Sequence, residues 1–127
     1  VVLGSLSLLD NQRLQDNAGN AQLARNLVSY SAPGARASGS QVMFLHHGTP
    51  ACTLDERCDI NGTATLRTIL GQQGYSVSDV ATTFGGLASV APAVKVIFIF
   101  MPTDDFSPSE VNVLKQFAAE GGRVVTV

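Results

Sequence analysis

Short apolar runs alternate with polar stretches along this chain. Runs rich in β-branched residues predict strands at residues 1–9, 41–46, 94–101 and 123–127. Residues 75–80 alternate between apolar and polar positions, which is typical of an edge strand. Residues 94–101 are apolar on both faces except at Lys95, as expected of the central strand of a parallel sheet.

Three segments have the periodicity of a helix, at residues 20–31, 63–73 and 109–120. The last has the clearest start signals. Ser107 suits the N-cap, Pro108 suits the first helical position, and Glu110 completes a capping box. Gly121 and Gly122 then end the helix.

The order of these elements predicts the fold class. Strands that alternate with helices indicate a three-layer α/β/α domain around a mainly parallel, five-stranded sheet. We expect a single domain over residues 1–127, in which residues 10–19 are polar and turn-rich. Residues 32–40, from the stretch "SAPGARASGS", are predicted to be a flexible linker between residues 1–31 and 41–127.

The composition narrows the classes of function. Of the 127 residues, 45% are hydrophobic and only 14% are charged, and the net charge is -2. The basic residues are few and scattered, which argues against a nucleic-acid binder. The longest apolar run is too short to span a membrane. The chain starts at Val1 rather than Met, as expected of a processed or excised product.

Four quoted stretches resemble one superfamily of domains. They are "VMFLHHG", "TLRTILGQQGYSVSDV", "VKVIFIFMP" and "SPSEVNVLKQFAAEGGRVVTV". Residues 41–127 are similar through them to class I glutamine amidotransferase-like domains of flavodoxin-like fold. These include ThuA-like proteins, the auxiliary domain of gliding-motility ABC systems and an intraflagellar-transport domain.

The resemblance implies a permuted order of elements. The family's last strand and helix match residues 1–30, so the chain is either circularly permuted or a fragment that joins two such domains. The family's strand order 2-1-3-4-5 then predicts the sheet order 75–80, 41–46, 94–101, 123–127, 1–9. The first four strands are expected to be parallel.

A nucleophile elbow is not found in the sequence. Neither G-x-C-x-G nor G-x-S-x-G occurs, and "GSLS" at residues 4–7 lacks the second glycine, so Ser5 is a weak candidate. We expect no cofactor.

Cys52 and Cys58 lie close together in the loop "HHGTPACTLDERCD". Their spacing fits neither C-x-x-C redox chemistry nor a common zinc site, so we expect a disulfide, with metal ligation or free thiols as the alternatives. Such a bond would stabilise the loop by about 2 kcal/mol. It would also place the protein outside the cytoplasm, in an extracellular or periplasmic compartment.

Two histidines and two aspartates follow neighbouring predicted strands. His46 and His47 end one strand, and Asp104 and Asp105 follow the central one. Ligands of open parallel sheets bind at this edge, so the four side chains could form a metal site or a base oriented by an acid. Alternatively, one histidine points into the packed layer and the aspartates are solvated near a helix start. No metal ligand set is assigned.

Amides form the remaining candidate sites. Asn11, Asn17 and Asn20 are expected at turns and helix starts, with a weaker hypothesis of carbohydrate binding. Asn61 begins the triplet Asn-Gly-Thr, a weak glycosylation signal.

Two functions remain in view. The first is a non-catalytic exported structural or binding module of a larger extracellular or cell-surface assembly, with protein partners or self-assembly. The alternative is a hydrolase or metal-dependent enzyme acting on a small polar or carbohydrate substrate through His46, His47, Asp104 and Asp105.

Overall fold

The computed structural model describes residue 3 and residues 8–30, 33–48, 62–83 and 85–127. The elements in chain order are α1 (Asn11–Asp16), α2 (Ala18–Ser29), β1 (Gln41–His47), α4 (Ala64–Gln72), β2 (Ser76–Thr82), β3 (Val94–Ile99), α5 (Pro108–Ala119) and β4 (Arg123–Thr126). Among these helices, none combines the length and apolar character needed to cross a bilayer.

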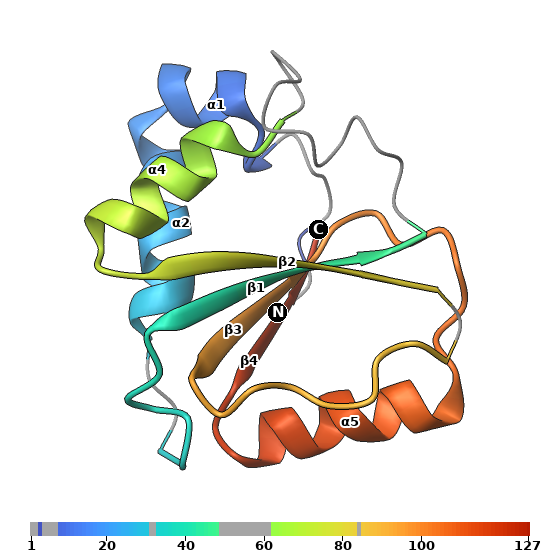
Figure 1. Ribbon diagram of the computed structural model, residues 1–127. Helices are drawn as coiled ribbons and strands as arrows, with labels where there is room; N and C mark the ends of the chain where they lie inside the picture. Colours follow the sequence, from blue (N-terminus) through green and yellow to red (C-terminus); the bar gives the residue numbers. More distant parts are fainter. Residues whose placement is uncertain (1–2, 4–7, 31–32, 49–61, 84) are drawn as a thin grey trace.

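The four strands form one parallel sheet in the order β2-β1-β3-β4 (Figure 1). This confirms the order and direction predicted for the first four strands. It also confirms β2 as an edge strand, most of whose residues are exposed. β3 is buried along its whole length, as its two apolar faces predict.

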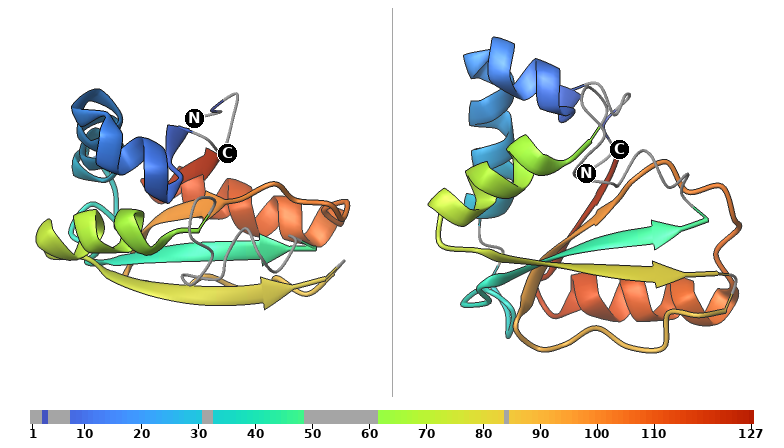
Figure 2. Two further views of the ribbon diagram at one scale, coloured as in Figure 1. Left: turned by 90° about the horizontal axis from the view of Figure 1, so that it is seen from above. Right: turned by 45° about the horizontal axis from the view of Figure 1, so that its top comes forward.

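The sheet has a hydrophobic core on each face. Val42 and Phe44 of β1 point toward α1, α2 and α4, whereas Met43 and Leu45 point toward α5. Helices therefore lie on both faces of the sheet, with α1, α2 and α4 on one side and α5 on the other (Figure 2). Successive side chains of β1 point to opposite faces, so a strand that is packed on both faces must be apolar at consecutive positions.

A β-bulge interrupts the pairing of β1 with β3. Gln41 pairs with Val94, but Val42 pairs with Val96, so Lys95 is the extra residue. The bulge turns Lys95 toward the face that carries α2, where its Nζ donates to the Tyr75 hydroxyl at 3.2 Å. A bulge re-aims one side chain at the cost of a local break in the ladder.

The N-terminal part differs from the prediction. Residues 10–19 were expected to be turn-rich, but they contain α1, which Asp10 caps through a 2.7 Å hydrogen bond from the Arg13 N–H. Leu8 and Leu9 lie in the turn before α1 rather than in a strand. Leu3 donates its N–H to the Thr126 carbonyl at 2.8 Å, beside β4. The rest of the predicted first strand lies outside the described residues.

Within the predicted linker, Arg36 holds residues 33–39 to the rest of the domain. Arg36 is buried, and its guanidinium bonds the Glu120 carboxylate and the carbonyls of Ala91, Val94 and Val90. Its backbone N–H also donates to the Glu120 carbonyl at 3.1 Å. These contacts join the segment to the end of α5 and to the loop that precedes β3.

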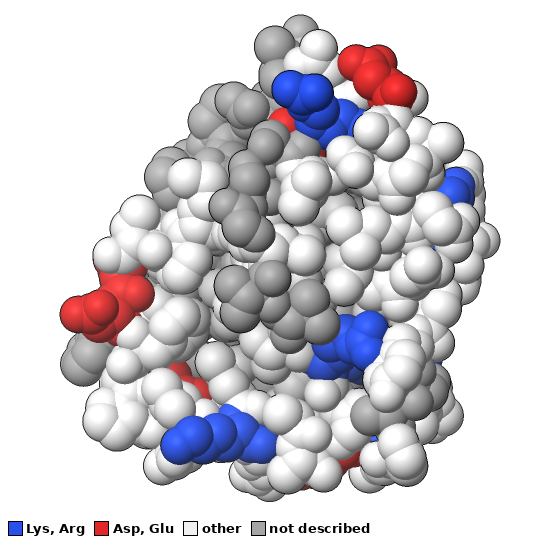
Figure 3. Space-filling model, turned by 180° about the vertical axis from the view of Figure 1, so that it is seen from behind, with Lys and Arg blue, Asp and Glu red and all other residues white. Residues whose placement is uncertain are grey.

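Charged side chains are sparse on the surface. On the face opposite to that of Figure 1, the charged residues form a few small groups with wide uncharged areas between them (Figure 3). This distribution agrees with the low charge content of the sequence.

Candidate functional site

The side chain of His47 is buried inside the domain at the carboxyl end of β1. It has no exposed surface. Nδ1 lies 2.9 Å from the hydroxyl of Thr82, its register partner on β2, and Nε2 lies 3.1 Å from the Asp105 carbonyl. A carbonyl only accepts, so Nε2 carries the proton, and Nδ1 is left to accept from the hydroxyl if the ring is neutral. Phe106 stacks on the ring at 4.1 Å.

The loops that follow β1 and β3 are bonded to each other through their backbones. The N–H groups of Thr103 and Asp104 point at the His47 carbonyl, at 3.1 and 3.5 Å. The Thr103 hydroxyl donates to the Gly48 carbonyl. Gly48 has φ +67°, and a Cβ there would meet the side chains of Thr103 and Asp104. Only glycine fits this close approach without strain.

Glu110 forms the second buried polar centre, next to His47. One carboxylate oxygen accepts from the backbone N–H groups of Ser107 and Gly85, and the other from that of Leu87. Burial raises the pKa of Glu110, but these hydrogen bonds and that from the Ser107 hydroxyl outweigh it and lower the pKa to about 2. The predicted capping box of α5 is confirmed, and it also anchors the loop before β3.

His46 lies on the opposite face of the sheet from His47. Its Nε2 is 2.8 Å from the Asp79 carboxylate, which also accepts from Arg67 at 2.6 Å. Burial raises the pKa of Asp79, but the hydrogen bonds from Arg67 and His46 outweigh it and lower the pKa. The Arg67 guanidinium covers the Phe44 ring at 4.7 Å, which fixes it over the sheet.

The structure therefore separates the four residues that the sequence suggested as one cleft. His47 meets the backbone carbonyl of Asp105 rather than its carboxylate, and the carboxylate near its Nδ1, at 3.8 Å, is that of Glu110. His46 meets Asp79 instead of Asp104 or Asp105. Asp105 is exposed and Asp104 is half-buried. Among the described residues, no group of three or more His, Cys, Asp or Glu side chains lies together as a metal site.

Asn11 and Asn17 are used at helix starts. The Asn17 side chain caps α2 by accepting from the N–H groups of Gly19 and Asn20. Asn11 is buried and accepts from the Thr65 N–H at 2.7 Å. It thereby caps α4, whose own N-cap residue, Thr63, makes no such bond. Asn20 is half-buried within α2.

Four of the suggested site residues lie outside the described part of the chain. They are Ser5, Cys52, Cys58 and Asn61.

Asp79, Arg67 and Thr82 are the polar partners that the sequence reading missed. Asp79 occupies an outward position of an alternating strand, where a carboxylate is ordinarily solvated. The available signal was the predicted neighbourhood of the strands 75–80 and 41–46, because diagonal neighbours on one face of paired strands are within side-chain reach.

Comparison with protein-family models, with curated proteins and with solved structures finds no match for this chain.

Proposed function

We propose that this chain is a non-catalytic exported module, with a structural or binding role in a larger extracellular or cell-surface assembly. The observation that supports it best is the burial and full hydrogen bonding of the His47 side chain. His47 lies at the carboxyl end of β1, where a ligand would be expected. Both of its ring nitrogens are hydrogen-bonded within the domain, and its side chain has no exposed surface. A general base needs a ring nitrogen within reach of a substrate proton.

The loops around His47 support the same proposal. In open parallel sheets, ligands bind where the chain leaves adjacent strands on opposite faces, which here is between β1 and β3. At this point Gly48, Thr103 and Asp104 are in direct contact. The polar groups there hold the two loops together.

The alternative, a hydrolase or metal-dependent enzyme, has one observation in its favour. His46 retains some exposure, and Asp79 orients its ring through Nε2, so Nδ1 could serve a ligand. A carboxylate that orients a histidine is the usual arrangement behind a metal ligand or a general base. Asp104 and Asp105 do not complete such a site in the described structure.

Zinc titration of the unreduced protein separates these functions. For a non-catalytic module we expect only weak zinc uptake by isothermal titration calorimetry, equal in the wild type and in His46→Asn. Stoichiometric zinc that is lost in both His46→Asn and Asp79→Asn would instead support the enzyme. Asp105→Asn is the matched control, because it removes an exposed carboxylate that contacts neither histidine through its side chain.

The proposed export depends on Cys52 and Cys58. We expect the native chain to weigh two hydrogens less than its sequence mass, because a bond forms between these two residues. Mass spectrometry without reductant measures this directly. Two thiols that alkylate in the native protein would contradict both the bond and the export.

For the fold, we propose that residues 1–7 complete a five-stranded, three-layer arrangement, as a permuted or fragmentary amidotransferase-like domain would require. The support is the hydrogen bond from the Leu3 N–H to the Thr126 carbonyl on the outer edge of β4. Leu3 also packs against the core that contains Val125. An unpaired, apolar edge strand would be prone to aggregation, and a fifth strand would cover β4.

Proline at position 3 tests this pairing. Leu3→Pro removes the N–H donor, whereas Leu3→Ala keeps it and removes only the packing. We expect Leu3→Pro to lower the free energy of unfolding by about 1 kcal/mol more than Leu3→Ala in urea titrations. Equal losses in the two variants would mean that no strand pairing forms at this edge.

A further inference from the structure

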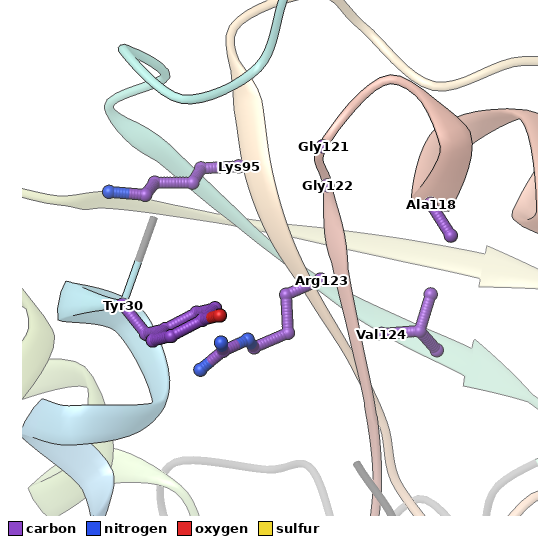
Figure 4. A pocket seen from close by; sticks show the side chains of 7 residues that line it. All are labelled: Tyr30, Lys95, Ala118, Gly121, Gly122, Arg123 and Val124. Carbon is purple, nitrogen blue, oxygen red and sulfur yellow. The ribbon is translucent and has the colours of Figure 1, made fainter. Parts of the chain in front are cut away.

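A cavity of about 280 Å³ opens where β3 and β4 begin, at the end of the sheet opposite the histidines (Figure 4). Lys95 comes from β3, Tyr30 follows α2, the turn between α5 and β4 contributes Gly121 and Gly122, and β4 begins with Arg123. Its volume is near the lower end of the range for small-molecule sites.

Lys95 lines this cavity as a buried cation without a carboxylate partner among the described residues. The residue is 7% exposed. Its ammonium donates to the Tyr75 hydroxyl, which in turn donates to the Val28 carbonyl at 3.0 Å. An ammonium has three N–H donors, and burial of a cation is costly without an anion. The charge at this position therefore favours an anionic ligand.

Arg123 presents a second cation from the neighbouring strand. One of its amino groups donates to the Leu27 carbonyl at 3.0 Å, and its guanidinium stacks on the Tyr30 ring at 4.2 Å. Figure 4 shows Lys95 and Arg123 projecting from their strands to the same side, with Tyr30 against the guanidinium. Four of the five guanidinium donors are not used by that bond, and a planar fork suits a carboxylate or phosphate.

The nearest acid of the α5–β4 turn is engaged elsewhere. Glu120 bonds Arg36 through one carboxylate oxygen and Gln116 through the other. No acidic side chain lines the cavity among the described residues. The described lining of the cavity therefore contains two basic residues, Lys95 and Arg123, and no internal counter-ion.

The bulge in β3 is an independent indication of a site. A regular ladder through Gln41 and Val94 would not leave Lys95 as an extra residue. Bulges are frequent beside functional sites, where they re-aim a side chain. Here the bulge directs the Lys95 ammonium to the Tyr75 hydroxyl, and Lys95 also lines the cavity.

We propose that this Lys95–Arg123 pocket binds the oxyanion, carboxylate or phosphate, of a small organic acid. The two cations hold the oxyanion, and Tyr30, which is 62% exposed, offers an apolar surface to the rest of the molecule. The site is separate from the His46–Asp79 pair, so it stands whichever proposed function is correct.

Titration with small aromatic probes tests the proposal by amide chemical shifts. Benzoate and phenyl phosphate carry the two oxyanions, and benzamide is the uncharged analogue of benzoate. We expect one or both anions to bind saturably in the millimolar range, and benzamide at least about tenfold more weakly. The tighter of the two anions identifies carboxylate or phosphate as the natural group.

Variants locate the binding. Lys95→Met and Arg123→Met should each weaken the anion at least about tenfold. Lys115→Met, an exposed change of the same kind on α5, should leave it unaltered. If Lys95→Met or Arg123→Met fails to fold, Arg123→Lys replaces it, because it keeps the charge and removes the fork. Binding of benzamide equal to that of benzoate, an equal effect of Lys115→Met, or no saturable binding would each overturn the proposal.

Discussion

Replacing Glu110 with glutamine is expected to lower the free energy of unfolding at pH 7 by about 3 kcal/mol. The carboxylate is fully buried and accepts from the backbone N–H groups of Ser107, Gly85 and Leu87. Glutamine has nearly the same shape, but its amide nitrogen would place N–H donors against one of these donors. Urea unfolding followed by circular dichroism measures the loss.

The pH dependence of this loss follows from the lowered pKa of Glu110. The pKa falls from its usual 4.5 to about 2 in the folded protein, so the folded state binds the proton more weakly than the unfolded state. The stabilisation is therefore complete above about pH 5 and is lost as the pH falls through 4.5 toward 2. The difference between the wild type and Glu110→Gln should shrink over the same interval.

Asp16→Asn is the matched control for Glu110→Gln. It changes the net charge equally, at an exposed position of α1. We expect it to change the free energy of unfolding by less than about 0.5 kcal/mol. A loss for Glu110→Gln that stays constant between pH 7 and 3 would show that its charge plays no part.

The sheet could be predicted because a buried strand and an edge strand have different patterns of apolar residues. The predicted strand 94–101 is apolar on both faces and contains the buried β3, which ends at Ile99. The predicted strand 75–80 alternates and overlaps the exposed edge strand β2, at Ser76–Thr82. The parallel order follows because the helices at 63–73 and 109–120 connect the strands by crossovers.

For the two histidines, the sequence predicts the face of the sheet but not the hydrogen-bond partners. Strand alternation predicts that His46 and His47 point to opposite faces, and His47 does enter the packed layer. Their partners depend on the register of β1 against β2, which sets His47 opposite Thr82 and His46 diagonal to Asp79. A slip of one residue would change every partner, and no local pattern fixes it.

The contacts of residues 10–19 and 33–39 share one feature, which is that no local sequence pattern predicts them. α1 is short and polar, and it is held by the Asp10 cap and by the contact of Asn11 with α4, which no periodicity reveals. The 33–39 segment has the small residues of a linker, but one long side chain fixes it. Arg36 forms its bonds with residues more than fifty positions away.

Arg36→Met is expected to lower the free energy of unfolding by about 3–4 kcal/mol. The guanidinium is buried over the Phe117 ring at 4.7 Å and bonds the Glu120 carboxylate at 2.7 Å. It also donates to the carbonyls of Ala91 and Val90, at 2.7 and 3.2 Å. Methionine keeps much of the apolar volume but leaves these acceptors unpaired, so the loss measures the polar contacts.

Two further variants separate the parts of that network. Glu120→Gln removes the charge of the partner but leaves the carbonyl bonds of Arg36, so we expect a smaller loss than for Arg36→Met. Arg36→Lys keeps the positive charge, but one ammonium cannot span the carboxylate and the carbonyls on either side of the guanidinium, so it should lose nearly as much. An Arg36→Lys variant as stable as the wild type would mean that charge alone fixes residues 33–39 to the domain. Equal losses for Glu120→Gln and Arg36→Met would assign the stabilisation to the ion pair rather than to the carbonyl bonds.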